Sequence, residues 1–285
     1  NEVNSGILAI KSILIKKLLP EIKNNNAANE YYLTDIVSLS KKHGIKVQPL
    51  LLEDPDEALG ANTPLELQDL ERACQRIRAK KLVNSGVNIA DIDRIDSRGS
   101  LAVGRGSFID VNNVFEGRVE IGKNTKIGPN CYIKDSVIGN EVTLQASTVI
   151  EDSRVGDLCK LGPFARIRGG TEIEDNAELG NFVEANRSKI GPESKAKHLT
   201  YLGDSNLGRN VNIGAGTITC NYDGKNKYKT KLDDGAFIGS NTSLVAPVKV
   251  GKEASTGAGS VITKNVPPGS LAIGRSRQSN IKRKK

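Results

Sequence analysis

The stretch Val119–Ile150, VEIGKNTKIGPNCYIKDSVIGNEVTLQASTVI, decides the fold of this chain. An aliphatic residue recurs in it at every sixth position, in two runs: Ile121, Ile127 and Ile133, then Ile138, Leu144 and Ile150. This spacing fits neither a helix, with its period of about 3.6 residues, nor a strand, with its period of about 2. It fits a coil with three flat faces, in which one aliphatic side chain per hexapeptide points inward. Glycine follows many of these residues, as in Ile121-Gly122, and permits the chain to turn at each corner.

The same period continues along most of the chain, at Val155, Leu161, Ile167, Ile173, Leu179, Leu202, Leu207, Ile213, Leu232, Ile238, Leu244, Val250 and Ile262. The repeat therefore extends from about Leu101 to Ile262, which at ~18 residues per turn corresponds to roughly nine turns. We predict a mainly β protein, a parallel β-helix of hexapeptide repeats. Its left-handed sense is implied by the resemblance to known hexapeptide coils, since periodicity alone does not determine handedness.

The sequence before this repeat has an α/β texture. Apolar runs at Ile7–Ile10 and Val47–Leu52 predict strands. Residues Ile13–Leu19 and Tyr31–Lys42 predict helices, which end at Pro20 and Gly44.

A third helix is predicted to begin at Thr63-Pro64-Leu65-Glu66, which combines an N-cap threonine, a proline in the first turn and a glutamate three residues after the cap. It should end by Gly86. We therefore divide the chain into the end of an α/β domain (1–62), a linker with a connecting helix (63–96), and the β-helix with a basic tail (97–285).

The composition excludes several classes of protein. The chain has 285 residues, of which 37% are hydrophobic and 26% charged, and no run approaches the ~20 apolar residues of a membrane span. The net charge is +8, with Arg275, Arg277 and the basic residues 282–285 crowded at the end. The remainder is nearly balanced, so we expect no nucleic-acid partner and treat the basic end as a solvated tail.

The four cysteines lie far apart, which favours a reducing, cytoplasmic location. The first residue is Asn1 rather than methionine, so we expect the sequence to begin within a longer protein.

Hexapeptide coils include acyltransferases, γ-class carbonic anhydrases and non-catalytic subunits, so the fold alone does not define the function. The carbonic anhydrases bind zinc through three histidines. His198 is the only histidine in the repeat, because His43 precedes it, so this class is excluded.

Four stretches of the repeat carry a specific resemblance: GPFAR (162–166), GNFVE (180–184), KHLTYLG (197–203) and NIGAGTITCNYDG (212–224). They resemble the bacterial bifunctional enzymes that combine glucosamine-1-phosphate N-acetyltransferase with N-acetylglucosamine-1-phosphate uridylyltransferase activity. The resemblance covers nearly the whole chain and implies that residues 97–285 form the acetyltransferase domain of a homotrimer with active sites between subunits. It implies acetyl transfer from acetyl-CoA to glucosamine 1-phosphate, on the route to UDP-N-acetylglucosamine for peptidoglycan and lipid A. The Mg²⁺-dependent uridylyl transfer would belong to a longer parent protein and is not expected of this chain alone.

The resemblance also implies roles for individual residues. His198 corresponds to the catalytic base, and Glu184 is expected to orient it. The expected sugar-phosphate contacts are Arg168, Asn186, Tyr201, Asn212 and Lys227. The expected acetyl-CoA contacts are Ala215, Asn221, Tyr222, Ser240, Ala258 and Arg275. In the first region Asn4 corresponds to a UDP-sugar contact and Asn62 to an Mg²⁺ ligand, although one amide oxygen does not make a magnesium site.

One position departs from the family pattern. The family usually has lysine at the position of Asn186, where it contacts the sugar phosphate, and Arg187 follows here. Losing a charged hydrogen bond costs about 1.5–3 kcal/mol unless Arg187 or another neighbour reaches the phosphate. Two alternatives therefore stay open: an acetyltransferase for another amino sugar, and a non-catalytic trimerising module, which a test of acetyl-CoA binding would distinguish.

The expected chemistry needs a group that removes a proton from the amine and donors that stabilise the tetrahedral oxyanion. Imidazole titrates near neutral pH, so His198 suits the first task, with direct attack on acetyl-CoA and no acyl-enzyme. Backbone N–H groups near Ala215 suit the second. Cys220 is expected to be a small apolar residue rather than a nucleophile. Lys227 lies in the polar excursion Asn221–Lys231, which leaves the repeat and could reach a neighbouring subunit.

Overall fold

A computed structural model describes residues 6–52, 58 and 60–281. The chain forms two compact units, Asn1–Ala73 and Cys74–Lys285. Their boundary falls within the helix α3 (Pro64–Asn84). The division into 1–62, 63–96 and 97–285 therefore stays a prediction.

The first unit contains the helix α1 (Ser12–Leu18), the short 3₁₀ helix η1 (Leu19–Glu21) and the helix α2 (Asp35–Lys42). Both helices lie where the sequence predicted them, although α2 begins at Asp35 instead of Tyr31. The two predicted strands are wrong, since residues 7–10 and 47–52 form neither strand nor helix. A strand exists only when a neighbouring strand pairs with its backbone, and no other described residue of this unit forms one.

The helix α3 begins with the predicted reciprocal cap. The Thr63 hydroxyl accepts the N–H of Glu66 at 3.2 Å, and the Glu66 carboxylate accepts the N–H groups of Asn62 at 2.7 Å and Thr63 at 3.1 Å. These backbone donors, with Asn62 first, hold the pKa of Glu66 below its usual value. The helix ends at Asn84, and Gly86 follows it with a φ of 94°.

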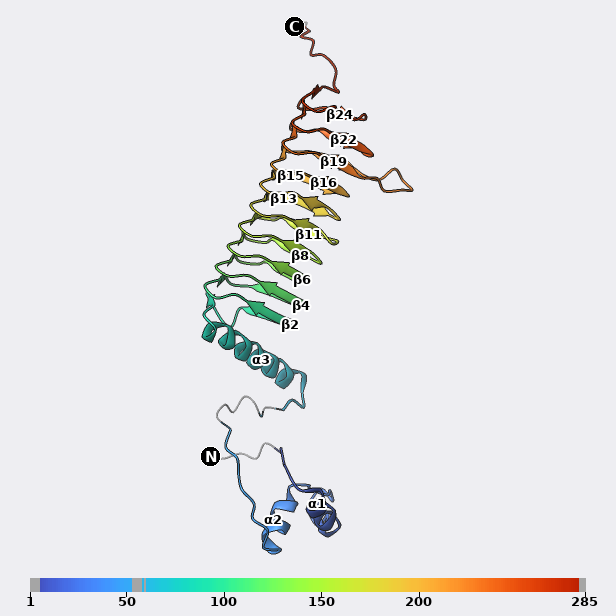
Figure 1. The fold of residues 1–285 in the computed structure, drawn as a ribbon. Coiled ribbons are helices and arrows are strands. Elements are labelled where there is room, and N and C mark those ends of the chain that lie inside the picture. The colour runs from blue at the N-terminus through green and yellow to red at the C-terminus, as the bar shows by residue number, and fades with distance from the viewer. Residues whose placement is uncertain (1–5, 53–57, 59, 282–285) are drawn as a thin grey trace, which may run out of the picture. The chain divides into compact units, whose positions relative to one another are not determined.

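The second unit is a coil of parallel strands stacked as rungs (Figure 1). The strands form three ladders, one for each face of the coil, and paired residues are 17 or 18 positions apart over most of the length, as in Ile133↔Ile150 and Phe115↔Ile133. The predicted fold class, a mainly β parallel β-helix of hexapeptide repeats, is confirmed.

The first ladder contains β1 (Asn88–Ile89), β3 (Phe108–Ile109), β5 (Lys126–Ile127), β7 (Thr143–Leu144), β10 (Lys160–Leu161), β13 (Glu178–Asn186), β15 (Lys195–Gly203), β17 (Asn212–Ile213), β20 (Phe237–Ile238), β23 (Ser255–Thr256) and β25 (Leu271–Ala272). The second contains β2 (Ile95–Val103), β4 (Asn113–Ile121), β6 (Tyr132–Ile138), β8 (Val149–Glu151), β11 (Arg166–Arg168), the later parts of β13 and β15, β18 (Ile218–Cys220), β21 (Ser243–Val245) and β24 (Val261–Ile262). The third contains the ends of β2, β4 and β6, then β9 (Arg154–Val155), β12 (Glu172–Ile173), β14 (Lys189–Ile190), β16 (Ser205–Leu207), β19 (Thr230–Leu232) and β22 (Val248–Val250). The coil begins before Leu101 and continues past Ile262, so it has about ten turns rather than nine.

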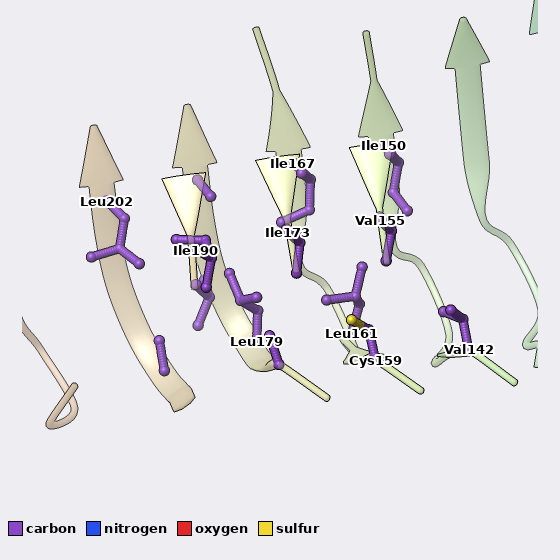
Figure 2. Close-up of a cluster of buried hydrophobic side chains, with 14 of the residues drawn as sticks. Val142, Ile150, Val155, Cys159, Leu161, Ile167, Ile173, Leu179, Ile190 and Leu202 are labelled. Atoms are coloured by element: carbon purple, nitrogen blue, oxygen red, sulfur yellow. The ribbon is translucent and has the colours of Figure 1, made fainter. Parts of the chain in front are cut away.

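The core of the coil consists of the aliphatic residues that define the repeat. Ile150, Ile167 and Leu202 stack along one ladder, and Leu161 and Leu179 along another, all pointing into the common interior (Figure 2). Each of them is at most 1% exposed. One inward residue per hexapeptide therefore forms a continuous and mostly aliphatic hydrophobic core, to which Phe115 adds an aromatic ring.

The second half of α3 covers the first turn of the coil. The strand β2 pairs with β4 on one side, and on the other the Gln75 side chain bonds to the backbone of Ser97. Its Nε2 donates to the carbonyl at 3.1 Å, and its Oε1 accepts the N–H at 2.7 Å. Arg78 also donates to this carbonyl, and Ala79 packs into the core. A buried amide thus satisfies the backbone groups of this sheet edge at Ser97.

In the described parts of the chain, no helix has the length and apolar character needed to cross a membrane.

Candidate active site

Five residues follow one corner of the coil on successive turns, which we call the histidine corner: Asn181, His198, Ala215, Ser240 and Ala258. Backbone bonds between turns place them in line. Asn181 pairs in register with His198. The N–H of Gly216 donates to Leu199 at 3.1 Å, that of Asn241 to Ala215 at 2.7 Å, and that of Gly259 to Ser240 at 2.8 Å. The predicted base and three predicted acetyl-CoA contacts therefore share one edge.

The imidazole of His198 is exposed at this corner. Its Nδ1 lies 2.6 Å from Oδ1 of Asn181, one turn earlier. Its second ring nitrogen therefore faces away from Asn181.

The expected role of Glu184 in orienting His198 stays a prediction, although its carboxylate has a different partner within this chain. This carboxylate binds Arg168, with Oε1 at 2.8 Å from Nε and 2.6 Å from Nη2. It pairs in register with Tyr201, three residues beyond His198 and on the next face. The residue that contacts the imidazole is Asn181, which sequence reasoning missed. A spacing of 17 residues, one turn of the coil, was the signal that could have found it.

Arg168 and Glu184 lie on the outer side of the second ladder. Ile167 points inward and is fully buried, so its neighbours Arg166 and Arg168 both point outward. The side chains of Arg168 and Glu184 are 34% and 31% exposed, so the guanidinium is held in a partly covered position. Asn186 follows Arg168 in register, one turn later.

Arg187 does not replace the lysine that is absent at position 186, because its guanidinium is already bound to other residues. Its Nε and Nη2 donate to the two carboxylate oxygens of Asp204 at 2.8 and 3.0 Å, and its Nη1 donates to Asn186 at 3.2 Å. This bidentate pair lowers the pKa of Asp204 and raises the pKa of Arg187. The Asn186 side chain is itself buried, with 3% exposure.

Asp204 also accepts a hydrogen bond from Nδ2 of Asn221, at the base of the excursion 221–231. This excursion projects from the coil as a loop between β18 and β19 (Figure 1). Within it Tyr222 bridges to Lys227, and the Asp223 carboxylate accepts the N–H groups of Lys225 and Asn226 at 2.8 and 2.7 Å. Lys227 is therefore exposed on a well-bonded loop whose base is tied to the coil.

Gly203 lies where Tyr201 and Asn221 meet. A Cβ atom added to it would stand 2.6 Å from the Tyr201 hydroxyl and 2.7 Å from Nδ2 of Asn221. We call Asn186, Arg187, Tyr201, Asp204 and Asn221 the Asp204 cluster. It unites two predicted sugar contacts with a predicted acetyl-CoA contact.

The other predicted residues lie apart from this cluster. Asn212 is on the first ladder, in register with Lys195 and Phe237. Tyr222 is exposed on the loop. Arg275 lies near the end of the histidine corner, with its Cδ 3.9 Å from the position of a Cβ on Gly259. Asn4 falls outside the described residues.

The expected role of Asn62 as a magnesium ligand stays a prediction. The N–H of Asn62 bonds to Glu66 in the cap of α3. In residues 6–52, 58 and 60–281, no group of three or more histidine, cysteine or acidic residues is placed to hold a metal ion.

An apolar strip, which the sequence did not reveal, flanks the histidine corner: Phe164, Phe182 and Leu199. These residues have φ angles of 57°, 55° and 49°, in the left-handed region that bulky side chains rarely adopt. All three are more than half exposed, and the two phenyl rings stack with their centres 5.2 Å apart. On other turns the same corner has asparagine in this conformation, for example Asn130 and Asn241. Such strain at an exposed apolar position is typical of a functional surface.

The repeat and the coil define this chain as a parallel β-helix protein of the hexapeptide class. Residues 97–205 match the family described as the GMPPB C-terminal domain. Residues 230–264 match the hexapeptide repeat of succinyl-transferase.

The chain is 52% identical over 283 residues to the bifunctional protein GlmU of Marinobacter nauticus, and 51% identical over 281 residues to that of Idiomarina loihiensis. These matches cover 98% and 99% of the chain and 62% of each relative. The chain is therefore similar to the bifunctional GlmU proteins over nearly its whole length and spans about three fifths of theirs.

Solved structures with a similar coil include the UDP-N-acetylglucosamine acyltransferase LpxA of Bacteroides fragilis. It is 20% identical, with a TM-score of 0.46, over 63% of this chain and 69% of that one. The corresponding acyltransferase of Francisella novicida gives 20% identity and a TM-score of 0.45, over 65% of this chain and 66% of that one.

Proposed function

We propose that this chain transfers an acetyl group from acetyl-CoA to the amine of glucosamine 1-phosphate. The observation that carries the proposal is the histidine corner. There His198, the one histidine of the repeat, shares an edge with Ala215, Ser240 and Ala258, which the family resemblance assigns to acetyl-CoA. The similarity to bifunctional GlmU proteins over nearly the whole chain supports it.

In this proposal His198 accepts a proton from the substrate amine as the nitrogen attacks the thioester carbonyl carbon. A C–N bond forms, and the carbonyl oxygen becomes an oxyanion. When the C–S bond breaks, the leaving thiolate takes the proton from the imidazolium, which returns the base to its neutral state. No acyl-enzyme is needed.

The backbone at Ala215 offers a donor for the oxyanion. On either side of it, the N–H of Gly214 donates to Ile238 at 2.8 Å and the N–H of Gly216 donates to Leu199. Within the described residues, the Ala215 N–H donates to no protein acceptor, so it is available to the ligand. One such donor contributes about 2.7–4 kcal/mol to the stability of a transition state.

The sugar phosphate would bind Arg168, whose guanidinium is oriented in advance by Glu184. Lys227, on the exposed loop, would supply a second positive charge to a neighbouring subunit. Two surface depressions lie elsewhere on the coil. One is lined by Arg154, Glu172 and Arg209, and the other by Val103 and Glu120 among others; both lie along the third ladder and exclude His198.

One observation favours another amino sugar as the acceptor. Asn186 is neutral and buried, and Arg187 is paired with Asp204, so neither supplies the charge that the family pattern has at this position. An acceptor with a weaker anionic group would suit this arrangement better.

The proposal covers acetyl transfer only, and uridylyl transfer is still expected of a longer parent protein rather than of this chain alone. The place of the acetyl transfer on the route to UDP-N-acetylglucosamine is part of the proposal.

The test is release of free thiol from acetyl-CoA, with glucosamine 1-phosphate and glucosamine 6-phosphate as alternative acceptors. We expect release with the 1-phosphate, and a loss of at least about 100-fold in His198→Ala. Release only with a different amino sugar would support the alternative substrate. A folded chain that does not bind acetyl-CoA would contradict both and leave the non-catalytic module.

A further inference from the structure

We propose that Asn181 is a positioning residue for His198, which holds the imidazole in the tautomer that leaves Nε2 free to accept a proton. The inference deepens the proposed acetyl transfer and rests on it for its catalytic meaning. The tautomer itself is a property of the chain and can be measured without any reaction.

The geometry supplies the first argument. Oδ1 of Asn181 lies 2.6 Å from Nδ1 of His198. An amide oxygen only accepts hydrogen bonds, so Nδ1 must have the proton in this contact. A neutral imidazole has one N–H, so Nε2 then has a lone pair and is the basic atom.

The backbone supplies the second argument, because it fixes the spacing of the two side chains. Asn181 and His198 are register partners on β13 and β15, and Val183 and Thr200 continue the same pairing beyond the corner. Just before the corner, a Cβ on Gly180 would stand only 2.0 Å from the carbonyl oxygen of Lys197. The two strands therefore approach closely at this point, and any side chain at position 180 would push them apart.

The surrounding charges supply the third argument. Lys197 is bound to Glu178 at 2.7 Å, and Glu184 is bound to Arg168. On the following turn Ala215 and Gly216 have no charge. In the described chain, Asn181 is thus the side chain that hydrogen-bonds to the imidazole, and the contact is neutral.

A neutral partner has a consequence for a general base. A carboxylate at this position would orient the ring equally well but would also favour the imidazolium, so the base would be protonated over more of the pH range. The amide orients the ring without adding a negative charge that would favour the imidazolium.

The kinetic test compares Asn181→Ala and Asn181→Asp with the wild type, with Asn206→Ala as control. Asn206 is an exposed asparagine of β16 on the third ladder. We expect Asn181→Ala to lower kcat by about 10- to 100-fold with the KM values changed less than about threefold. Asn181→Asp should be more active than Asn181→Ala at high pH and should move the acidic limb of kcat/KM up by about one pH unit. Asn206→Ala should match the wild type.

The second test reads the tautomer directly. The chain has two histidines, His43 and His198, so selective ¹⁵N-histidine labelling gives two ring systems, and His198→Ala identifies which is which. We expect a protonated Nδ1 and an unprotonated Nε2 in the wild type at pH 8, with the preference lost in Asn181→Ala.

The proposal is overturned by an Nε2–H tautomer in the wild type. It is also overturned if Asn181→Ala retains kcat within twofold, or if the pH profile of Asn181→Asp coincides with that of the wild type. A wild-type chain with the expected tautomer but no thiol release would refute the acetyl transfer alone.

Discussion

At the scale of single residues, Gly203 brings the Asp204 cluster together. It lies in β15 and has an ordinary backbone conformation, so an alanine there would meet no backbone strain. A larger residue at this position would clash with its neighbours, because the hydroxyl of Tyr201 and the amide of Asn221 occupy the volume that a methyl group would need.

We therefore expect Gly203→Ala to displace Tyr201 and Asn221 and to destabilise the protein by about 1–3 kcal/mol. The KM for the acceptor sugar should rise about tenfold, because the affected side chains are proposed ligands. Thermal unfolding and steady-state kinetics measure the two effects. Gly60→Ala, where a Cβ would meet nothing within 4 Å, is the control. An unchanged KM in Gly203→Ala would separate this cluster from the substrate.

The Asn186–Arg187 pair explains why site residues could be predicted singly but not as a group. The family pattern located Asn186, and the sequence left open whether Arg187 compensates for the missing lysine. The answer depends on Asp204, which lies one turn later and was not a candidate. A pairing between turns depends on register, which changes with a single inserted residue.

At the scale of elements, each two-residue strand combines an inward and an outward side chain. In β5, Ile127 is fully buried and Lys126 is exposed. The free energy of the coil should therefore depend strongly on one position and weakly on its neighbour.

We expect Ile127→Ala to lower the free energy of unfolding by about 2–5 kcal/mol, because it leaves a cavity in the core. Lys126→Ala should change it by less than about 0.5 kcal/mol. Urea unfolding followed by circular dichroism gives both values. Equal midpoints for the two variants would show that the inward ladder does not hold the coil together.

The strands of the coil could be predicted because the same hexapeptide pattern, with one inward aliphatic residue, recurs on every turn. The apolar runs at 7–10 and 47–52 look equally strand-like, but an apolar run does not specify a partner. The contacts of Glu184 were hard to predict for a related reason, and its expected role in orienting His198 stays a prediction. It lies near His198 in the motif pattern, yet the corner places the two on different faces, and Asn181 occupies the contact.

At the scale of the whole molecule, we expect a homotrimer. The apolar strip of Phe164, Phe182 and Leu199 is largely exposed beside the histidine corner. Lys227 stands on a loop away from its own His198 ladder. In a trimer, a second copy of the chain would cover the apolar strip and would receive Lys227 at its own site.

Sedimentation equilibrium should give a mass of about three times 30.6 kDa. Lys227→Ala should keep this mass and lose acetyl transfer, because the loop base is held by Asp204 and Asn221 and not by the lysine. A monomer that is fully active would contradict the shared site.

The amide of Gln75 also covers part of the first end of the coil. A coil of parallel strands ends in a rung whose unused hydrogen-bonding groups match those of any other such end, so bare coils would join end to end into filaments. Gln75 and Arg78 take up the groups of Ser97 with side chains of a helix, which offers no further rung to the next molecule. The helix therefore protects the first end of the repeat, at Ser97, from such joining.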